Sequence, residues 1–145
     1  MNGRILFDGY VAGRPTPKGS FKPIKSAGRV WLKPDSSDAL SAWVANLRAA
    51  IPTPHDVTQS AVSVDVTFFL ARPKKHYTKK GIRPDAPVWV SKKPDIDKLQ
   101  RALLDALTGV VWHDDEQVVQ IEARKCWCAR ESEPGCMLNI TEVAE

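Results

Sequence analysis

The segment KKPDIDKLQRALLDALTGVVWHDDEQV, at residues 92–118, contains two pairs of aspartates with an amphipathic stretch between them. Asp95 and Asp97 precede the apolar stretch, and Asp114 and Asp115 follow it. Hard cations such as Mg²⁺ prefer carboxylate oxygens, and a bound divalent ion removes the repulsion within a cluster of acids. Such an ion can polarise a phosphoryl oxygen and lower the pKa of a bound water. The four acids therefore predict a metal site for phosphodiester chemistry, provided that the chain brings the two pairs together.

The same acids also have a structural interpretation. One of Asp95 and Asp97 can cap a helix while the other complements its dipole, which leaves Asp114 and Asp115 without a role. A helix of about 12 residues rises about 18 Å. Asp115 therefore reaches Asp97 only if residues 109–114 run back along the helix. The residues alone leave both interpretations open.

The elements that must position these acids follow from the hydrophobic pattern. A helix is expected from about Asp97 to Thr108, because its apolar residues recur at helical spacing. That stripe consists of Ile96, Leu99, Leu103, Ala106, Leu107 and Val110. Leu104 lies outside the stripe and suggests a second packed surface, such as a contact between two copies of the chain.

The rest of the chain predicts further strands and one more helix. Strands are expected at residues 4–12, 61–71, 117–128 and 136–143, and an extended loop or irregular hairpin at 13–34. A helix capped by Ser36 or Ser37 is expected to end before Pro52. The order β-α-β-α-β-β predicts an α/β (α+β) fold, a single domain of residues 1–145 with a mixed sheet and two main helices.

Basic residues concentrate in and beside the long polar loop at residues 72–94. The formal net charge is only +4, but residues 72–101 hold ten Lys and Arg against three Asp. Such a stripe suits a polyanion such as nucleic acid, although a solvated surface loop is the alternative. His76 and Tyr77 in this loop are expected to be an exposed pair, with stacking on an unpaired base as the alternative. The candidate DNA-contacting residues are Lys18, Lys22, Lys74, Lys75, Lys79, Lys80, Lys92, Lys93 and Lys98.

The cysteines and the apolar runs narrow the class of protein. Three cysteines and no secretory signal favour a reducing compartment, and their spacing does not predict a zinc site. No apolar run approaches the length of a membrane span. A cytoplasmic protein with no membrane partner is expected.

The segment PDIDKLQRALLDALTGVVWHDDEQV, residues 94–118, resembles the RusA family of Holliday junction resolvases, especially its phage and prophage branch. The family pattern begins with Asp-x-Asp-Asn-Leu and a basic residue one turn later. It continues with Asp-Ala-Leu within the helix and Asp-Asp before Gln-Val. The closing LNITE also resembles the family's last strand.

This resemblance implies a Mg²⁺-dependent homodimeric endonuclease, with Mn²⁺ as an alternative ion. Such an enzyme nicks four-way DNA junctions in recombination and repair by attack of metal-activated water on the phosphodiester. Its catalytic metal-binding acids would be Asp95, Asp97 and Asp115, and Asp114 would be a secondary ligand or a support. The family's essential basic residue, usually Lys, falls at Arg101.

Two positions depart from the family pattern. Arg101 keeps the positive charge and can reach a phosphate, but an Arg cannot give up a proton as a Lys can. An electrostatic role therefore survives the change, and a proton-transfer role does not follow. The usual Asn after the second Asp is Lys98 here, which removes an amide and adds a cation near the metal.

Two other functions fit parts of the sequence. A non-catalytic, basic DNA-binding protein would use the acids only for caps and ion pairs, and it would need no metal. A metal-dependent nucleotide phosphohydrolase would favour a Gly-rich phosphate loop, whereas the prolines of GRPTPKG lack amide donors. A resolvase must make two nicks, and the chain shows one acid cluster and no repeat, so a homodimer is expected.

Overall fold

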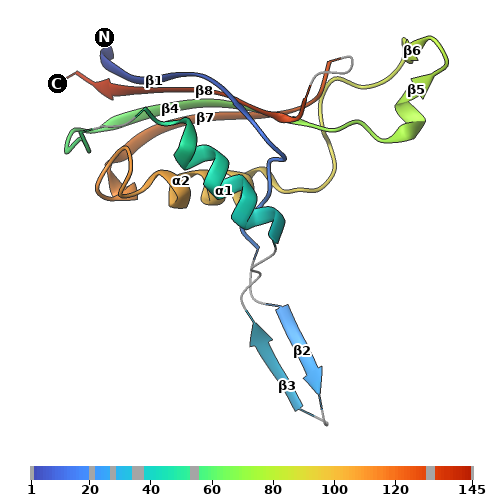
Figure 1. Ribbon diagram of the computed structural model, residues 1–145, viewed down its shortest axis with the longest axis horizontal. Coiled ribbons are helices and arrows are strands. Elements are labelled where there is room, and N and C mark those ends of the chain that lie inside the picture. Colours follow the sequence, from blue (N-terminus) through green and yellow to red (C-terminus); the bar gives the residue numbers. More distant parts are fainter. Residues whose placement is uncertain are drawn as a thin grey trace.

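Four strands form a mixed sheet in the computed structural model, and two helices cover one face of it (Figure 1). The strand order is β1 (Asn2–Ala12), β8 (Gly135–Val143), β4 (Val62–Leu70) and β7 (Val118–Trp127). β4 and β7 run parallel, and the other two pairings are antiparallel. The structure describes residues 2–19, 22–26, 29–33, 38–52, 56–129 and 133–144, without the side chains at 2, 22–26 and 29–33. The expected α+β fold with a mixed sheet is confirmed.

The core lies between the sheet and the helices. Strand side chains alternate between two faces, and every second residue of β4 from Val62 to Leu70 is buried. Leu138 and Ile140 of β8 face the same core, opposite Val66 and Val64. The strand expected at 61–71 is therefore confirmed, with its apolar face turned to the helices.

Helices α1 (Asp38–Ala50) and α2 (Ile96–Leu107) lie side by side below the sheet (Figure 1). In the expected apolar stripe, Leu99, Leu103, Ala106 and Leu107 are buried, and Ile96 and Val110 are half-buried. Each fully buried Leu contributes about 1.5–3 kcal/mol. Leu104, expected to be left over, is half-buried and packs against the core. The expectation for Leu104 differs from the structure because the face of α2 that packs on the core is wider than the helical spacing of apolar residues indicates. Ser36 and Ser37, the expected caps of α1, lie outside the described residues.

The segment before α1 contains a hairpin of β2 (Lys22–Ser26) and β3 (Arg29–Lys33), which extends away from the sheet (Figure 1). This matches the irregular hairpin expected there. Lys22 opens β2, but its side chain lies outside the described part of the chain, so its predicted contact with DNA is not described.

The long loop after β4 is fastened to the body of the protein. It contains the 3₁₀ turn η1 (Lys74–His76) and the short strands β5 (Tyr77–Thr78) and β6 (Gly81–Ile82). His76 is buried, with its ring edge-on to Trp127 and the ring centroids 5.2 Å apart. The expected exposed position of His76 is therefore wrong, because the aromatic ring of β7 covers it. No helix in the described residues is long and apolar enough to cross a membrane.

Candidate active site

The start of α2 presents two carboxylates to solvent. Asp95 occupies the N-cap position, yet its side chain makes no capping hydrogen bond. Instead, an Asp95 Oδ2 lies 3.7 Å from Nζ of Lys98. Asp97 is exposed in the first turn, where its charge complements the helix dipole. The structural interpretation therefore accounts for Asp97 through the helix dipole, whereas Asp95 pairs with Lys98 and does not cap the helix with its side chain.

Lys125 of β7 holds this start in place. Its Nζ donates hydrogen bonds to the carbonyl oxygens of Lys92, at 2.7 Å, and Pro94, at 2.8 Å. The peptide bond between Lys93 and Pro94 is cis. Because Lys125 lies on the side of β7 that faces the helices, it fixes the chain directly before Asp95.

A groove of about 700 Å³ opens where the parallel strands β4 and β7 end. Its lining includes Asp95 together with the cations Arg14, Lys93 and Lys98, over apolar surface from Leu70, Ala71 and Trp127. The carboxyl ends of parallel strands are a common place for ligand sites. We call this the basic groove. A hollow of about 760 Å³ between β1 and α1 is lined by none of the predicted site residues.

Asp114 and Asp115 lie in a capped turn beyond the other end of α2. Asp115 begins the 3₁₀ turn η2 (Asp115–Gln117), and Asp114 caps it by accepting a 3.0 Å hydrogen bond from Glu116 N. Gln117 Oε1 accepts hydrogen bonds from the backbone N–H groups of His113, at 2.8 Å, and Asp114, at 2.9 Å. Asp114 therefore supports the turn that exposes Asp115.

The pKa of Asp115 lies above its ordinary value. The first cause is a hydrogen bond with the Asp114 side chain, followed by partial desolvation and the charges of Asp114 and Asp105. Asp115 is thus close enough to Asp105 to sense its charge. Asp105 follows Asp97 by eight residues, about 12 Å along the helix.

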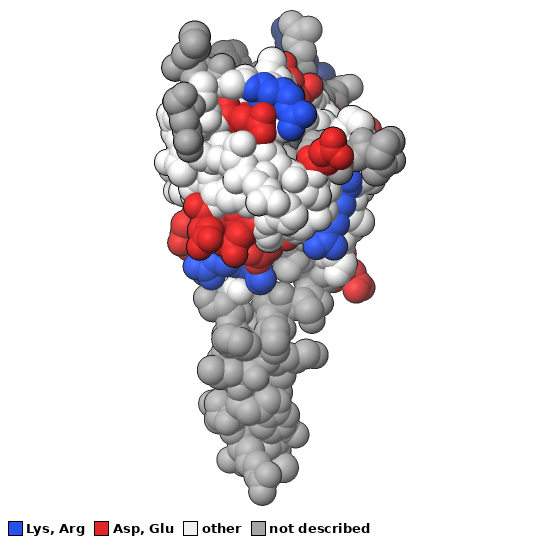
Figure 2. All heavy atoms as spheres, turned by 90° about the vertical axis from the view of Figure 1, so that its left-hand side faces the viewer, with Lys and Arg blue, Asp and Glu red and all other residues white. Residues whose placement is uncertain are grey.

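The side chains of Asp114 and Asp115 contact each other, and Asp95 and Asp97 lie two residues apart at the start of α2. Within the described residues, no group of three His, Cys, Asp or Glu side chains is placed to hold a metal ion. Figure 2 faces the end of the molecule where α2 stops, and it shows acidic side chains gathered next to basic ones. Lys18 forms an ion pair with Asp105.

The predicted basic residues are largely accessible. Arg101 is exposed one helical turn after Asp97, and Lys98 is half-buried at the basic groove. Lys18 is exposed, and its backbone N–H donates to the carbonyl oxygen of Lys98. Side chains that are exposed in and after the long loop are those of Lys74, Lys75, Lys79, Lys80, Lys92 and Lys93.

Three contributors to the site were missed from the sequence. Arg14 lines the groove, Lys125 fixes the start of α2, and Gln117 completes the capped turn. The spacing Asp-x-x-Gln at residues 114–117 is that of a capping box and was a usable signal for Gln117. Lys125 and Arg14 act through contacts distant in sequence, so no local pattern indicates them.

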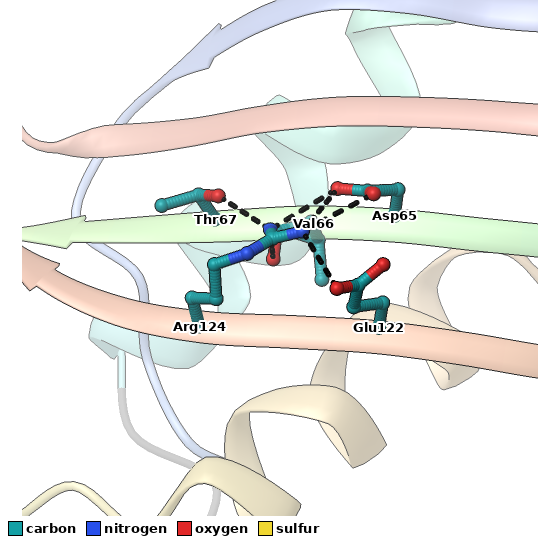
Figure 3. Close-up of polar contacts among 5 residues, drawn as sticks. All are labelled: Asp65, Val66, Thr67, Glu122 and Arg124. Atoms are coloured by element: carbon teal, nitrogen blue, oxygen red, sulfur yellow. Dashed lines mark hydrogen bonds and ion pairs between the residues drawn. The ribbon is translucent and has the colours of Figure 1, made fainter.

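Arg124, one residue before Lys125, points to the opposite face of the sheet. Figure 3 shows its guanidinium among Asp65, Thr67 and Glu122. The Arg124 nitrogens lie 3.1 Å from Asp65 Oδ1 and 3.5 Å from Glu122 Oε1. The Asp65 hydrogen bonds raise the pKa of Arg124. Its charge is thus already matched by acids on the sheet face away from the helices.

Comparison with known proteins places this geometry in a family. The family model described as Endodeoxyribonuclease RusA matches residues 12–141. The chain is also 29% identical over 144 residues to "Uncharacterized protein YqaN" of Bacillus subtilis (strain 168), covering 92% of this chain and 94% of that protein. RusA nucleases are metal-dependent Holliday junction resolvases that bind branched DNA. The chain belongs to the RusA endodeoxyribonuclease family and is a hydrolase of that class.

Proposed function

We propose that this chain is a Mg²⁺-dependent nuclease that nicks four-way DNA junctions in recombination and repair. It acts in the cytoplasm as a homodimer of one domain, residues 1–145. The observation that carries the proposal is the position of Asp95. This carboxylate stands at a helix start without capping it, in a groove lined by three cations.

The carboxylates at the start of α2 suit a hard divalent cation. Mg²⁺ is usually bound by one or two carboxylates together with waters and substrate phosphates. Asp95 and Asp97 supply two such oxygen donors, and both are exposed. A bound Mg²⁺, or Mn²⁺ in its place, would polarise a phosphoryl oxygen and lower the pKa of a water. Asp115 is proposed as the third catalytic acid from its position in the family motif, with Asp114 as its support.

The cations around these acids would bind and orient the DNA backbone. Arg14, Lys93 and Lys98 can hold a phosphate against the groove. Arg101 can neutralise charge on the phosphate, and its role is electrostatic because an Arg does not release its proton. The exposed lysines of the long loop would extend the contact along the DNA arms, without reading sequence.

Two active sites are needed to cut two strands of one junction. A four-way junction has approximate two-fold symmetry, and one chain carries one motif of this kind. A homodimer with two-fold symmetry would present one site to each of the two strands. The proposed dimer contact includes the exposed part of Leu104, which is half-buried against the core.

A cleavage assay tests the substrate and the metal together. End-labelled four-way junctions and linear duplexes of equal length are incubated with the protein, with Mg²⁺ or with EDTA. We expect nicks near the branch point of the junction, only with Mg²⁺. Asp95→Asn and Asp97→Asn should abolish cutting while junction binding is kept or tightened, because removing negative charge near a phosphate does not weaken binding.

Asp8→Asn is the control, since it makes the same change of charge at an exposed aspartate of β1, outside the proposed site. It should retain most cutting. Normal nicking by both Asp95→Asn and Asp97→Asn would overturn the proposed site. Tight junction binding with no cutting in any metal would favour the binding-only alternative.

A further inference from the structure

Trp89 presents a large aromatic ring to solvent. Its side chain is 61% exposed, whereas Trp43 and Trp112 are 1% and 0% exposed in the core. A single exposed apolar side chain is ordinary on a protein surface. Exposure alone therefore does not indicate a function for Trp89, and the contacts and charge of the segment that carries it must be considered.

The backbone on both sides of Trp89 is pinned to the protein. Val90 N donates to the carbonyl oxygen of Lys125 at 3.1 Å, and Trp127 N donates to that of Val88 at 2.8 Å. Trp89 itself forms an antiparallel bridge with Cys126. The ring is thus carried by a backbone segment that is bridged to the edge of β7.

Arg72 fastens the same segment from the other side. One of its guanidinium nitrogens donates to the carbonyl oxygen of Pro87 at 2.8 Å, and another donates to that of Cys128 at 2.7 Å. A group that is already held in place loses little conformational entropy when it binds a ligand. The backbone that carries Trp89 is therefore preorganised for a contact.

The loop that carries Trp89 is strongly basic. Residues 72–94 contain eight Lys and Arg and one Asp. A protein surface that docked on Trp89 would have to meet this excess of positive charge, whereas a nucleic acid strand is attracted by it. The charge therefore favours a nucleobase over an apolar protein surface as the partner of the ring.

Trp89 and the basic groove lie at the same end of the sheet. The carbonyl oxygen of Lys125 accepts a hydrogen bond from Val90 N, and its Nζ donates one to the carbonyl oxygen of Pro94. Lys125 therefore contacts both the segment that carries Trp89 and the segment before Asp95. Asp95 follows Trp89 by six positions, and six extended residues span at most about 22 Å. The ring points to the same sheet face as its bridge partner Cys126, away from the helices, so a DNA strand reaches both sites by passing round the edge of β7.

We propose that Trp89 is a stacking site for an unpaired nucleobase at the branch point of the junction. Every base has an aromatic face, so the contact recognises an open branch point without reading sequence. Base-paired duplex offers no such face within its stack. Trp89 thereby contributes selectivity for branched over linear DNA, and the buried His76 cannot take this role.

This inference rests on the binding of branched DNA and is tested without cleavage. Binding of labelled four-way junction and matched linear duplex is measured by fluorescence anisotropy in EDTA. Trp89→Ala should weaken junction binding about 5- to 150-fold, the effect of losing one base–aromatic stack. Duplex affinity should stay within about twofold. Trp89→Phe should keep most of the junction affinity, and Val88→Ala, at an equally exposed neighbour, should change neither.

A second measurement tests directly whether Trp89 stacks on a base at the branch point. With 2-aminopurine at the branch point, wild-type protein should change the fluorescence of the probe, and Trp89→Ala should not. Equal weakening of junction and duplex, or no weakening of either, would overturn the proposal. A lower mass of Trp89→Ala in light scattering, with unchanged selectivity, would assign the ring to a protein contact instead. Asp97→Asn loses cutting but not binding, so failure at Trp89 and failure of the proposed nuclease site are distinguishable.

Discussion

Gln117 ties the turn that carries Asp115 to the segment before β4, and its replacement is a demanding test of the site. Its Oε1 accepts from the backbone N–H groups of His113 and Asp114, and its Nε2 donates to the carbonyl oxygens of Thr58, at 3.0 Å, and Ser60, at 2.9 Å. Gln117→Ala removes all four hydrogen bonds.

The expected loss follows from these contacts. A hydrogen bond contributes about 0.5–1.5 kcal/mol net, and the partial exposure of this side chain favours the lower half of that range. Gln117→Ala should therefore lower the free energy of unfolding by about 2–4 kcal/mol. Gln117→Glu keeps an acceptor for the two N–H groups but turns an oxygen toward the carbonyls of Thr58 and Ser60. It should lose less stability.

Urea unfolding and junction cleavage measure the two consequences. We expect Gln117→Ala to slow cutting strongly even where it is fully folded, because the turn that presents Asp115 is released. Gln120→Ala, at an exposed glutamine three residues later in β7, should stay within about 0.5 kcal/mol and cut normally. Wild-type stability of Gln117→Ala would refute the stabilising role of these four hydrogen bonds. Full cutting by the same variant would refute their role in positioning Asp115.

Further predictions concern the DNA-binding loop, an acidic side chain and a buried thiol. Replacing Lys79 and Lys80 with Ala should weaken junction binding and reduce its salt slope by roughly one unit per lost phosphate contact, and an unchanged slope would make them solvated surface. The Thr58 hydrogen bond holds the pKa of Glu142 below its ordinary value, so its stabilisation is present at neutral pH and is lost as the pH falls through the folded pKa. Glu142→Gln should therefore destabilise the protein at pH 7 more than at pH 3, and equal losses would contradict this. Burial raises the pKa of Cys136 to about 12, so its thiol should resist alkylation at pH 8 until the protein unfolds, as mass spectrometry can follow.

The sequence predicts this fold where the pattern is local. The alternating valines of β4 and the helical stripe of α2 were sufficient, because burial of one face controls both elements. The hairpin before α1 was also expected from its turn residues. Leu104 was misjudged because the width of a buried helix face depends on what packs against it.

The candidate site was predictable in its chemistry but not in its geometry. The spacing of Asp95 and Asp97 indicates that both lie at one helix start. The place of Asp115 depends on how far the chain turns back after α2, which contacts with residues 58–60 determine. The burial of His76 and the fixed position of Trp89 likewise depend on β7, nearly forty residues or more away in sequence.

Metal binding by the two carboxylates of α2 is the most direct test of the proposed site. Electron paramagnetic resonance of Mn²⁺ measures the ion left free as protein is added. We predict that wild-type protein and Asp8→Asn remove free Mn²⁺ saturably, and that Asp97→Asn does so far more weakly while it still binds the junction. Equal Mn²⁺ binding by wild type and Asp97→Asn would contradict a metal site at the start of α2.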